Sequence, residues 1–436
     1  MSVPPSESSA VRRLESPVDL VAAFRSLAAR TADLFWLDAG AAAIDGWSLL
    51  GTGTRDDVGP GAVRLDADDA PDGPPFRGGW VGWWDYESGA ADAGAPSADS
   101  EGGAAWLRVT AAIAVDHATG EAWAIGDDLP VVGSSSERSE TKRGERAPRV
   151  EASRHVASAR HTPAEYAALI ERCRDDIRAG TAYQLCLTTR FSVPGAHDDV
   201  AAYLRLRAAT PAHHGGFVRI GGRALLSASP ETFLHAAGGV IRTRPIKGTR
   251  PRGATDADDA RLAAELVASA KERAENVMIV DLMRNDLSRV CVPGSIRVEG
   301  LWVVESYPAV HQLVSTVSGR ARHGLRVDDL RRAAFPAGSM TGAPKLSAMT
   351  VLHEREGGRP RGIYSGCFGY VGVDGALDLA MVIRSIVMDA SGAVVGAGGG
   401  ITWGSVASEE VAEVATKAAA PLAAVGARLP EDWGRD

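Results

Sequence analysis

The sequence has few of the features that mark secreted, membrane-embedded or nucleic-acid-binding proteins. Its four cysteines in 436 residues are widely spaced and form no zinc or redox pattern, which favours a reducing, cytoplasmic environment. No apolar run approaches the ~18 residues of a membrane span, and Met1–Arg13 lacks the apolar core of a signal peptide. The formal net charge of −8 argues against a nucleic-acid binder. We therefore expect a cytoplasmic globular protein that binds neither nucleic acid nor membranes.

Composition and periodicity divide the chain into five stretches. We expect residues 1–15 to be disordered, 16–132 to form a β-rich N-terminal region, 133–150 to be a flexible linker, 151–428 to form the main region that carries the chemical motifs, and 429–436 to be a tail. Strands and helices are mixed without strict βαβ alternation, which predicts an α+β fold and not a Rossmann sheet.

Several predicted elements carry the candidate residues. Thr162-Pro163 predicts a helix start. Residues 256 to about 286 have the pattern of one helix, and 408 to 425 that of another. Residues 377–388 are predicted to be a strand, and Gly396–Gly400 a glycine-rich loop.

The most unusual local chemistry is the basic run from Arg244 to Gly253, which is rich in proline and glycine. The alternation before it predicts a strand that Pro245 would end. Lys247 should then lie at a strand end on a bent loop, where catalytic groups are often carried. By its residues alone, this run is a candidate site for a small anion.

Two pairs of glutamates at a spacing of three are candidate metal ligands. Glu272 and Glu275 share one helix face, and Glu410 and Glu413 share another that lies beside an apolar stripe. A few carboxylates together with water and substrate suit Mg²⁺. A solvated helix face with weak ion pairs explains the same spacing, so the sequence leaves both interpretations open.

Four further features are candidates for substrate chemistry. Ser229-Pro230-Glu231 places a carboxyl at a strand end, either as a general acid in a cleft or in a surface turn. The runs Gly338–Lys345 and Gly396–Ile401 match neither a P-loop nor a dinucleotide fingerprint, but their N–H groups can bind a carboxylate. Arg384, flanked by apolar residues, requires a fixed anion, which is either a ligand or a buried partner. A lone histidine such as His311 is more typical of a structural side chain.

These motifs, in this order, resemble those of the chorismate-utilising enzymes, which include anthranilate, aminodeoxychorismate, isochorismate and salicylate synthases. The resemblance is dense from about Ala164 to Gly426, and 16–132 resembles the N-terminal region of anthranilate synthase large subunits more loosely. It implies a single large α+β domain in which two packed β-sheets are surrounded by helices. The matching motifs are Ala228-Ser229-Pro230-Glu231, Pro245–Gly253, Glu272–Asn276, Asp281–Asp286, Pro308–Leu313, Gly338–Lys345, Tyr364-Ser365-Gly366 and Gly398–Lys417.

One segment departs from the family pattern. Family members usually have acidic residues and proline where this chain has Gly404–Ser408. The later glutamates are retained, so we expect an altered loop and retained metal binding.

Two positions discriminate within the family. In isochorismate and salicylate synthases a lysine that activates water stands where this chain has Gln184, and a glutamine cannot act as a general base. Anthranilate synthases usually carry a small residue at the position of Lys247, whereas aminodeoxychorismate synthases carry lysine in a Pro-Ile-Lys-Gly-Thr motif, as here. The resemblance implies that Lys247 adds to C2 of chorismate before ammonia attacks C4. We expect the neighbouring arginines to disfavour the protonated lysine.

The resemblance also implies roles for the other candidates. Glu231 would be the general acid, while Glu275 and Glu413 would hold Mg²⁺ and Glu272 and Glu410 would support it through water. The catalytic set is Lys247, Glu231 and Gln184. The implied substrate-binding set is His311, Ser339, Thr341, Tyr364, Arg384, Gly398, Gly399, Gly400, Lys417 and Thr249.

The activity that this resemblance favours is the formation of 4-amino-4-deoxychorismate by a large subunit. No segment offers the nucleophilic-cysteine elbow of a glutaminase, so we expect a separate glutamine amidotransferase subunit to supply ammonia and a lyase to act on the product. An anthranilate synthase, an aminodeoxyisochorismate-forming relative and an inactive chorismate-binding homologue remain alternatives.

Overall fold

The computed structural model describes residues 10–41, 43–66, 73–99, 103–127, 155–307 and 310–434. Its helices are α1 Leu20–Ala28, α2 Tyr86–Asp92, α3 Pro163–Arg178, α4 Asp199–Ala209, α5 Asp256–Ala268, α6 Ala270–Ser288, α7 Val327–Ala334, α8 Lys345–Arg355 and α9 Ala407–Ala424, with short 3₁₀ turns η1 Gly338–Met340 and η2 Glu431–Trp433. Its strands are β1 Val11–Arg13, β2 Leu34–Asp38, β3 Trp47–Arg55, β4 Gly79–Trp84, β5 Ala105–Asp116, β6 Ala122–Gly126, β7 His155–Val156, β8 Ser158–Ala159, β9 Gln184–Pro194, β10 His214–Ile220, β11 Arg223–Ser229, β12 Thr232–Ala237, β13 Val240–Thr243, β14 Ile246–Pro251, β15 Arg297–Ser306, β16 Val310–Arg320, β17 Gly342–Ala343, β18 Cys367–Gly372, β19 Leu377–Met381, β20 Ser385–Asp389, β21 Gly392–Ile401 and β22 Ala427–Arg428.

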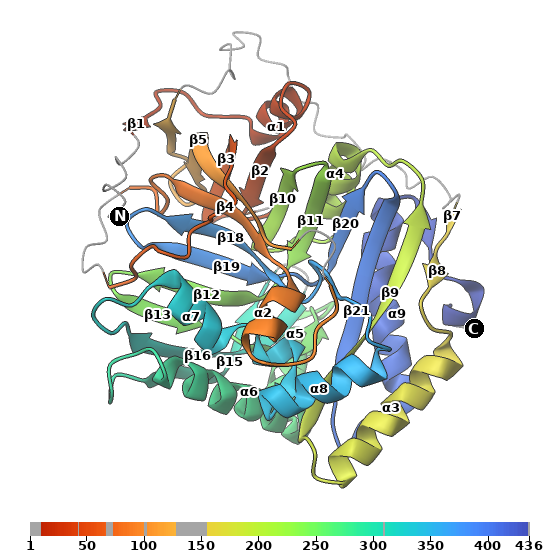
Figure 1. Cartoon of the computed structure of the whole chain (residues 1–436). Helices are drawn as coiled ribbons and strands as arrows, with labels where there is room; N and C mark the ends of the chain where they lie inside the picture. Colours follow the sequence, from red (N-terminus) through yellow and green to blue (C-terminus); the bar gives the residue numbers. More distant parts are fainter. Residues whose placement is uncertain are drawn as a thin grey trace.

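The strands form two layers. The first runs β1-β6-β5-β3-β2-β10-β11-β20-β21-β9, and every pair in it is antiparallel. The second runs β4-β18-β19-β12-β13-β16, with β14 on the same edge of β16 as β13, and β15 on the other edge. The layers are continuous because β5 pairs with β3 and also with β4 (Figure 1).

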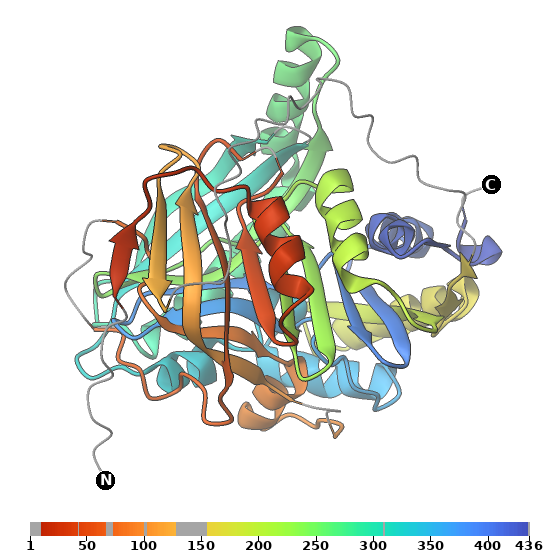
Figure 2. The same ribbon diagram turned by 90° about the horizontal axis from the view of Figure 1, so that it is seen from above.

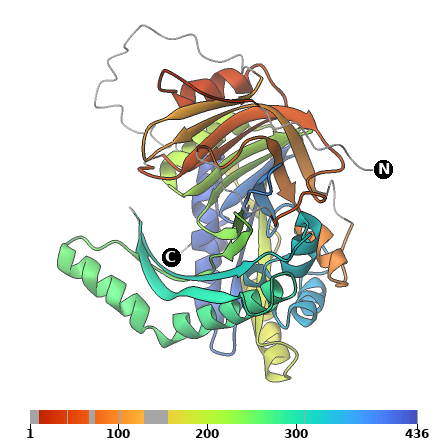
Figure 3. The same ribbon diagram turned by 90° about the vertical axis from the view of Figure 1, so that its left-hand side faces the viewer.

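Alternation along each strand divides the apolar side chains between three cores. Phe35 of β2, Leu225 of β11 and Phe368 of β18 meet between the two layers. The other face of the first layer packs against α1, α3, α4, α8 and α9, and that of the second layer against α6 and α7. Figure 3 shows α5 and α6 lying along β15 and β16. The expected α+β fold of two packed sheets surrounded by helices is therefore confirmed.

Helix ends follow the local sequence, with one departure from expectation. At α3, Thr162 and Glu165 form a complete capping box and Pro163 occupies the first turn, as Thr162-Pro163 predicted. The single helix predicted for 256 to about 286 is wrong, because it breaks at Ser269. Ser269 leaves the helical conformation and its hydroxyl accepts from Glu272 N–H, so it caps the start of α6.

Two other expected elements differ. Residues 377–388 are not one strand, since Val382–Arg384 separates β19 from β20 and Arg384 has a φ of 52°. Gly396–Gly400 is not a loop but part of β21, where it pairs with Cys186–Arg190 of β9. The partner strand lies far away in the sequence, so local composition gave no signal of the pairing.

The ends of the described chain are more ordered than the sequence suggested. Val11–Arg13, assigned to a disordered N-terminus, pairs with β6. The tail from residue 429 includes buried Trp433, whose indole Nε1 donates to the His161 carbonyl at 2.9 Å. The expected linker at 133–150 lies outside the described residues. No helix in the described part of the chain is long and apolar enough to span a bilayer.

Candidate active site

Lys247 projects from an irregularity in strand β14. The pairing of β14 with β16 shifts register between Ile246 and Thr249, and Gly248 there has a φ of 85°. A bulge of this kind re-aims a side chain. The ammonium nitrogen reaches strand β21, where a Cβ on Gly400 would lie 3.6 Å from it. The expected bend is present, but Lys247 lies within strand β14, at a bulge, and not on a loop after the preceding strand.

The arginines around Lys247 do not face it as a group. Arg244 pairs with Glu305, and Arg252 pairs with Asp259 at 2.7 Å. Arg250 lies 3.6 Å from carboxylate oxygens of both Glu265 and Glu272. Each guanidinium thus has a carboxylate partner of its own, so the expected role in keeping the lysine unprotonated has no geometric support.

Glu231 is the buried acid of the site, with 8% of its surface exposed. It follows β11 at the turn into β12. Burial raises the pKa of Glu231 above its ordinary value, while Lys247, a hydrogen bond from Ser339 and Lys417 act in the opposite direction. The carboxyl is therefore buried within the electrostatic reach of Lys247 and has a raised pKa, which fits a general acid better than a surface turn.

The four glutamates of α6 and α9 form one electrostatic cluster. Burial raises the pKa of Glu275, and the nearby charges of Glu272 and Glu410 add to the shift. Burial also raises the pKa of Glu410, with a contribution from Glu413. Glu275 of α6 and Glu410 of α9 are therefore close enough for their charges to interact, which favours one shared cluster over two separate solvated faces.

Three lysines supply opposite charge to this cluster. Lys417 Nζ lies 2.8 Å from Glu413 and donates to the Gly398 carbonyl at 2.7 Å. Burial would raise the pKa of Glu413, but Lys417, Lys247 and Lys271 together lower it. Lys271, on the first turn of α6, was not singled out from the sequence, although its position one residue before Glu272 could have suggested it.

The carboxylates are candidate ligands for a Mg²⁺ ion. They are hard oxygen ligands whose mutual repulsion a divalent cation would relieve. Glu410 is already oriented by Ser405, whose hydroxyl donates to it at 2.8 Å. Among the residues that the structure describes, no three His, Cys, Asp or Glu side chains converge closely enough to enclose a metal. Water and substrate oxygens would have to complete the coordination.

Gln184 is a buried amide without a partner. It opens β9, is fully buried, and neither its oxygen nor its nitrogen has a hydrogen-bond partner among the described residues. A Cβ on Gly400 would lie 2.7 Å from its Nε2, so only glycine leaves room there. Leaving buried polar atoms unpaired costs about 1–3 kcal/mol, which a bound ligand would recover.

Tyr364 lies on the same face of β21 as Gln184, because Gly396, which faces Tyr364, and Gly400 are four residues apart in one strand. The Tyr364 ring packs against Gly396. Burial lowers the pKa of Arg384, and Glu413 and Tyr364 oppose that shift. Arg384 has no ion pair within 4 Å in the described part of the chain, which leaves its guanidinium available to an anion.

The remaining predicted residues are less directly placed. Ser339, in η1, contacts Glu231, and the buried Thr341 hydroxyl donates to the Ala337 carbonyl at 3.1 Å. Both ring nitrogens of His311 are occupied, by Asp259 at 2.9 Å and Ser306 at 2.8 Å. Thr249 is exposed. The structure thus links Ser339 to the Lys247 cluster but engages His311 elsewhere.

Comparisons with known proteins agree with these motifs. A model of the family described as chorismate binding enzyme matches residues 60–423. The chain belongs to this family. The aminodeoxychorismate synthase of Streptomyces pristinaespiralis is 40% identical over 378 residues, which cover 80% of this chain and 51% of that protein. The anthranilate synthase component 1 of Streptomyces coelicolor is 38% identical over 378 residues, which cover 81% and 73%.

A solved structure extends the agreement to the fold of the chorismate-binding enzymes. Anthranilate synthase component I from Streptococcus pneumoniae matches with a TM-score of 0.68 at 25% identity, over 96% of this chain and 92% of that one. The chain spans about half the length of the aminodeoxychorismate synthase from S. pristinaespiralis. The family inferred from the motifs is therefore confirmed.

Proposed function

We propose that this chorismate-binding enzyme converts chorismate and ammonia to 4-amino-4-deoxychorismate. The observation that carries the proposal is the position of the Lys247 amine, which lies 3.6 Å from where a Cβ on Gly400 would be and whose charge lowers the pKa of Glu231, Glu275 and Glu413. A nucleophile at this point can reach a ring held between β14 and β21.

In the first step the neutral Lys247 amine attacks C2 of chorismate. The conjugated double bonds shift, and the C4 hydroxyl leaves as water with the proton of Glu231. Burial raises the pKa of this carboxyl, so more of it carries a proton near neutral pH than in water. Covalent attachment divides one difficult displacement into two easier steps.

In the second step ammonia attacks C4. The double bonds shift back, and Lys247 leaves C2 as a neutral amine. Glu231 regains its proton from the new ammonium group. The unpartnered amide of Gln184, which cannot remove a proton from water, is positioned to orient the nitrogen nucleophile.

Glu275 and Glu413 would hold Mg²⁺, supported by Glu272 and Glu410, and the ion would neutralise and orient a substrate carboxylate. Arg384, Tyr364 and the β21 backbone from Gly398 to Gly400 would hold the second carboxylate. Lys417, fixed by Glu413 and Gly398, supplies positive charge between the two.

A separate glutamine amidotransferase subunit would supply the ammonia. Relatives of Salmonella typhimurium and Escherichia coli, 43% and 42% identical over 256 residues, are named aminodeoxychorismate synthase component 1. A numbered component favours a partner protein in this case also. The product would then pass to a lyase that removes the enolpyruvyl group.

Anthranilate formation is the second candidate, because the S. coelicolor relative is an anthranilate synthase component 1. Incubating the protein with chorismate, Mg²⁺ and ammonium, followed by chromatography, separates the candidates. Aminodeoxychorismate is the expected product. Accumulation of anthranilate without an added lyase would refute the proposal, and chorismate binding without turnover would identify an inactive homologue.

A further inference from the structure

Arg361 is a buried cation that lies behind the active site and was not noticed in the sequence. Its side chain is 2% exposed, and that of its partner Glu356 is 3% exposed. The guanidinium donates to both oxygens of Glu356, from Nε at 2.9 Å and from Nη2 at 2.7 Å. Such a two-bond pair fixes orientation as well as distance.

The other guanidinium donors reach two main-chain carbonyls. Nη1 donates to the Met340 carbonyl at 2.7 Å, and Nη2 donates to the Cys186 carbonyl at 2.8 Å. Met340 ends η1, the turn that carries Ser339, and Cys186 is two residues after Gln184 in β9. One planar group therefore ties together two segments that both reach the Lys247 cluster.

The guanidinium is itself held firmly. Glu356 also accepts from the N–H and the hydroxyl of Thr188, each at 2.9 Å. The backbone N–H groups of Arg361 and Gly362 donate to Glu87 of α2 at 2.6 and 2.9 Å. A buried network that is satisfied in this way rigidifies the groups attached to it.

We propose that Arg361, oriented by Glu356, is a positioning residue that sets the separation of η1 from β9 and thereby holds Ser339 against Glu231. This inference rests on the proposed function, in which Glu231 delivers a proton. The hydrogen bonds of the Arg361 guanidinium in the described structure reach neither the reacting atoms nor the glutamates of α6 and α9, so its effect on the reaction would pass through Ser339.

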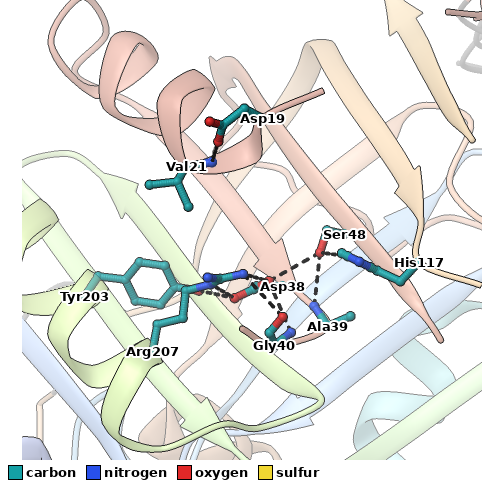
Figure 4. A network of polar contacts seen from close by, with 9 residues as sticks. All are labelled: Asp19, Val21, Asp38, Ala39, Gly40, Ser48, His117, Tyr203 and Arg207. Carbon is teal, nitrogen blue, oxygen red and sulfur yellow. Dashed lines mark hydrogen bonds and ion pairs between the residues drawn. The ribbon is translucent and has the colours of Figure 1, made fainter. Parts of the chain in front are cut away.

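If Arg361 only stabilised the fold, its replacement would lower stability without a specific effect on kcat. A second arginine in the chain provides a matched control for this alternative. Arg207 of α4 forms a two-bond pair with the buried Asp38 at the end of β2, at 2.5 and 3.2 Å, with 17% of the arginine side chain exposed (Figure 4). Arg361→Lys and Arg207→Lys both keep the charge and lose the planar fork. Both should lower the melting temperature.

The test is a pair of double-mutant cycles with Ser339→Ala, read as kcat and KM for chorismate with saturating ammonium. Arg361→Lys should lower kcat by about a hundredfold, the loss expected for a displacement of about 1 Å at a reacting group. Adding Ser339→Ala to Arg361→Lys should cost little more, because the two changes remove one interaction. Arg207→Lys should leave kcat within about threefold of wild type. In the double variant Arg207→Lys/Ser339→Ala, the loss of kcat should equal the product of the two single losses.

The proposal would be overturned if the double variant Arg361→Lys/Ser339→Ala lost kcat by the product of the two single losses. It would also be overturned if Arg361→Lys and Arg207→Lys lowered kcat equally. If Arg361→Lys does not fold, the same cycle with Glu356→Gln decides, with the same expected non-additivity. Failure of the wild-type protein to form aminodeoxychorismate would instead refute the proposed function, so the two failures are distinguishable.

Discussion

Two charged clusters adjoin strands of the first layer. They differ in whether their buried polar atoms have hydrogen-bond partners. Around Asp38, every carboxylate oxygen has a partner: Arg207 and Tyr203 on one side, Ser48 and the Gly40 N–H on the other (Figure 4). Around Lys247, burial and neighbouring carboxylates raise the pKa of Glu275 and Glu410, and the buried amide of Gln184 has no partner among the described residues.

The difference indicates, independently of any relative, which of the two clusters is the better candidate for a functional site. A satisfied buried network stabilises one conformation and has nothing left to offer a ligand. A network with unpaired buried polar atoms lowers the stability of the fold, and a ligand that pairs with those atoms restores it. Perturbed carboxylates that adjoin a lysine and a free amide are the expected signature of a catalytic site. Figure 2 shows α9, which carries Glu410 and Glu413, beside α4, which carries Tyr203 and Arg207 of the Asp38 network.

The largest expected effect on activity comes from replacing Lys247, and it distinguishes the Lys247 cluster from the Asp38 cluster most clearly. Replacing Lys247 by Ala should lower aminodeoxychorismate formation by about 10³-fold or more, the scale of losing a covalent nucleophile, and allows anthranilate to form by direct attack at C2. Product chromatography measures both compounds. Intact-mass detection of a ring adduct on the wild-type protein tests the covalent step directly, and an unchanged rate and product for the variant would rule it out.

Substitutions in the glutamate cluster should change the affinity for Mg²⁺. Glu413→Gln should weaken Mg²⁺ binding by about 10- to 100-fold, as the loss of a carboxylate near a metal commonly does. Isothermal titration calorimetry with MgCl₂ measures this without turnover. Glu409→Gln makes the same charge change on the exposed face of α9 and should leave the affinity unaltered. Equal affinities for the two variants would contradict the assignment.

Residue type and spacing made the Lys247 motif, Glu231 and the glutamate pairs candidates but left other interpretations open. Their assignment to one site came from the resemblance to the chorismate-utilising enzymes, and the electrostatic interactions of Lys247 with Glu231, Glu275 and Glu413 agree with it. Ser269 with Glu272 also carried a capping signal that was overlooked, so one helix was predicted where two exist.

Long-range partners could not be predicted. Arg361 has Glu356 nearby in sequence, but its carbonyl partners lie at Met340 and Cys186, and only the folded chain brings them together. The strand conformation of Gly396–Gly400 likewise depends on β9. Sequence patterns report periodicity and capping, whereas these features depend on which strands become neighbours.

Substitutions in the Asp38 cluster should change the free energy of unfolding. Asp38→Ala leaves the Arg207 charge buried without its partner, so the free energy of unfolding should fall by about 3 kcal/mol. Denaturant unfolding measures this change. In the same preparation, kcat should stay within about threefold of wild type, because no contact links Asp38 to the Lys247 cluster in the described structure. A loss of kcat comparable to that of Lys247→Ala would show that the two clusters are not independent.

The smallest effect concerns the proton on Glu231. As a general acid, Glu231 is active while protonated, so activity should fall as pH rises through its raised pKa. The hydrogen bond from Ser339 favours the carboxylate, and removing it in Ser339→Ala should move this basic limb upward by about one pH unit, since a hydrogen bond to a charged group contributes about 1.5 kcal/mol. The profile of kcat against pH measures the shift.

Ser347→Ala provides the control for this last change. Ser347 lies on α8 and donates to the Thr181 carbonyl at 2.6 Å, away from Glu231. Its profile should coincide with that of wild type. Lys417→Met, which removes a positive charge that lowers the pKa of Glu231, should shift the limb in the same direction as Ser339→Ala. A downward shift in either variant would mean that the limb reports a group other than Glu231, and the proton donor would have to be sought elsewhere in the Lys247 cluster.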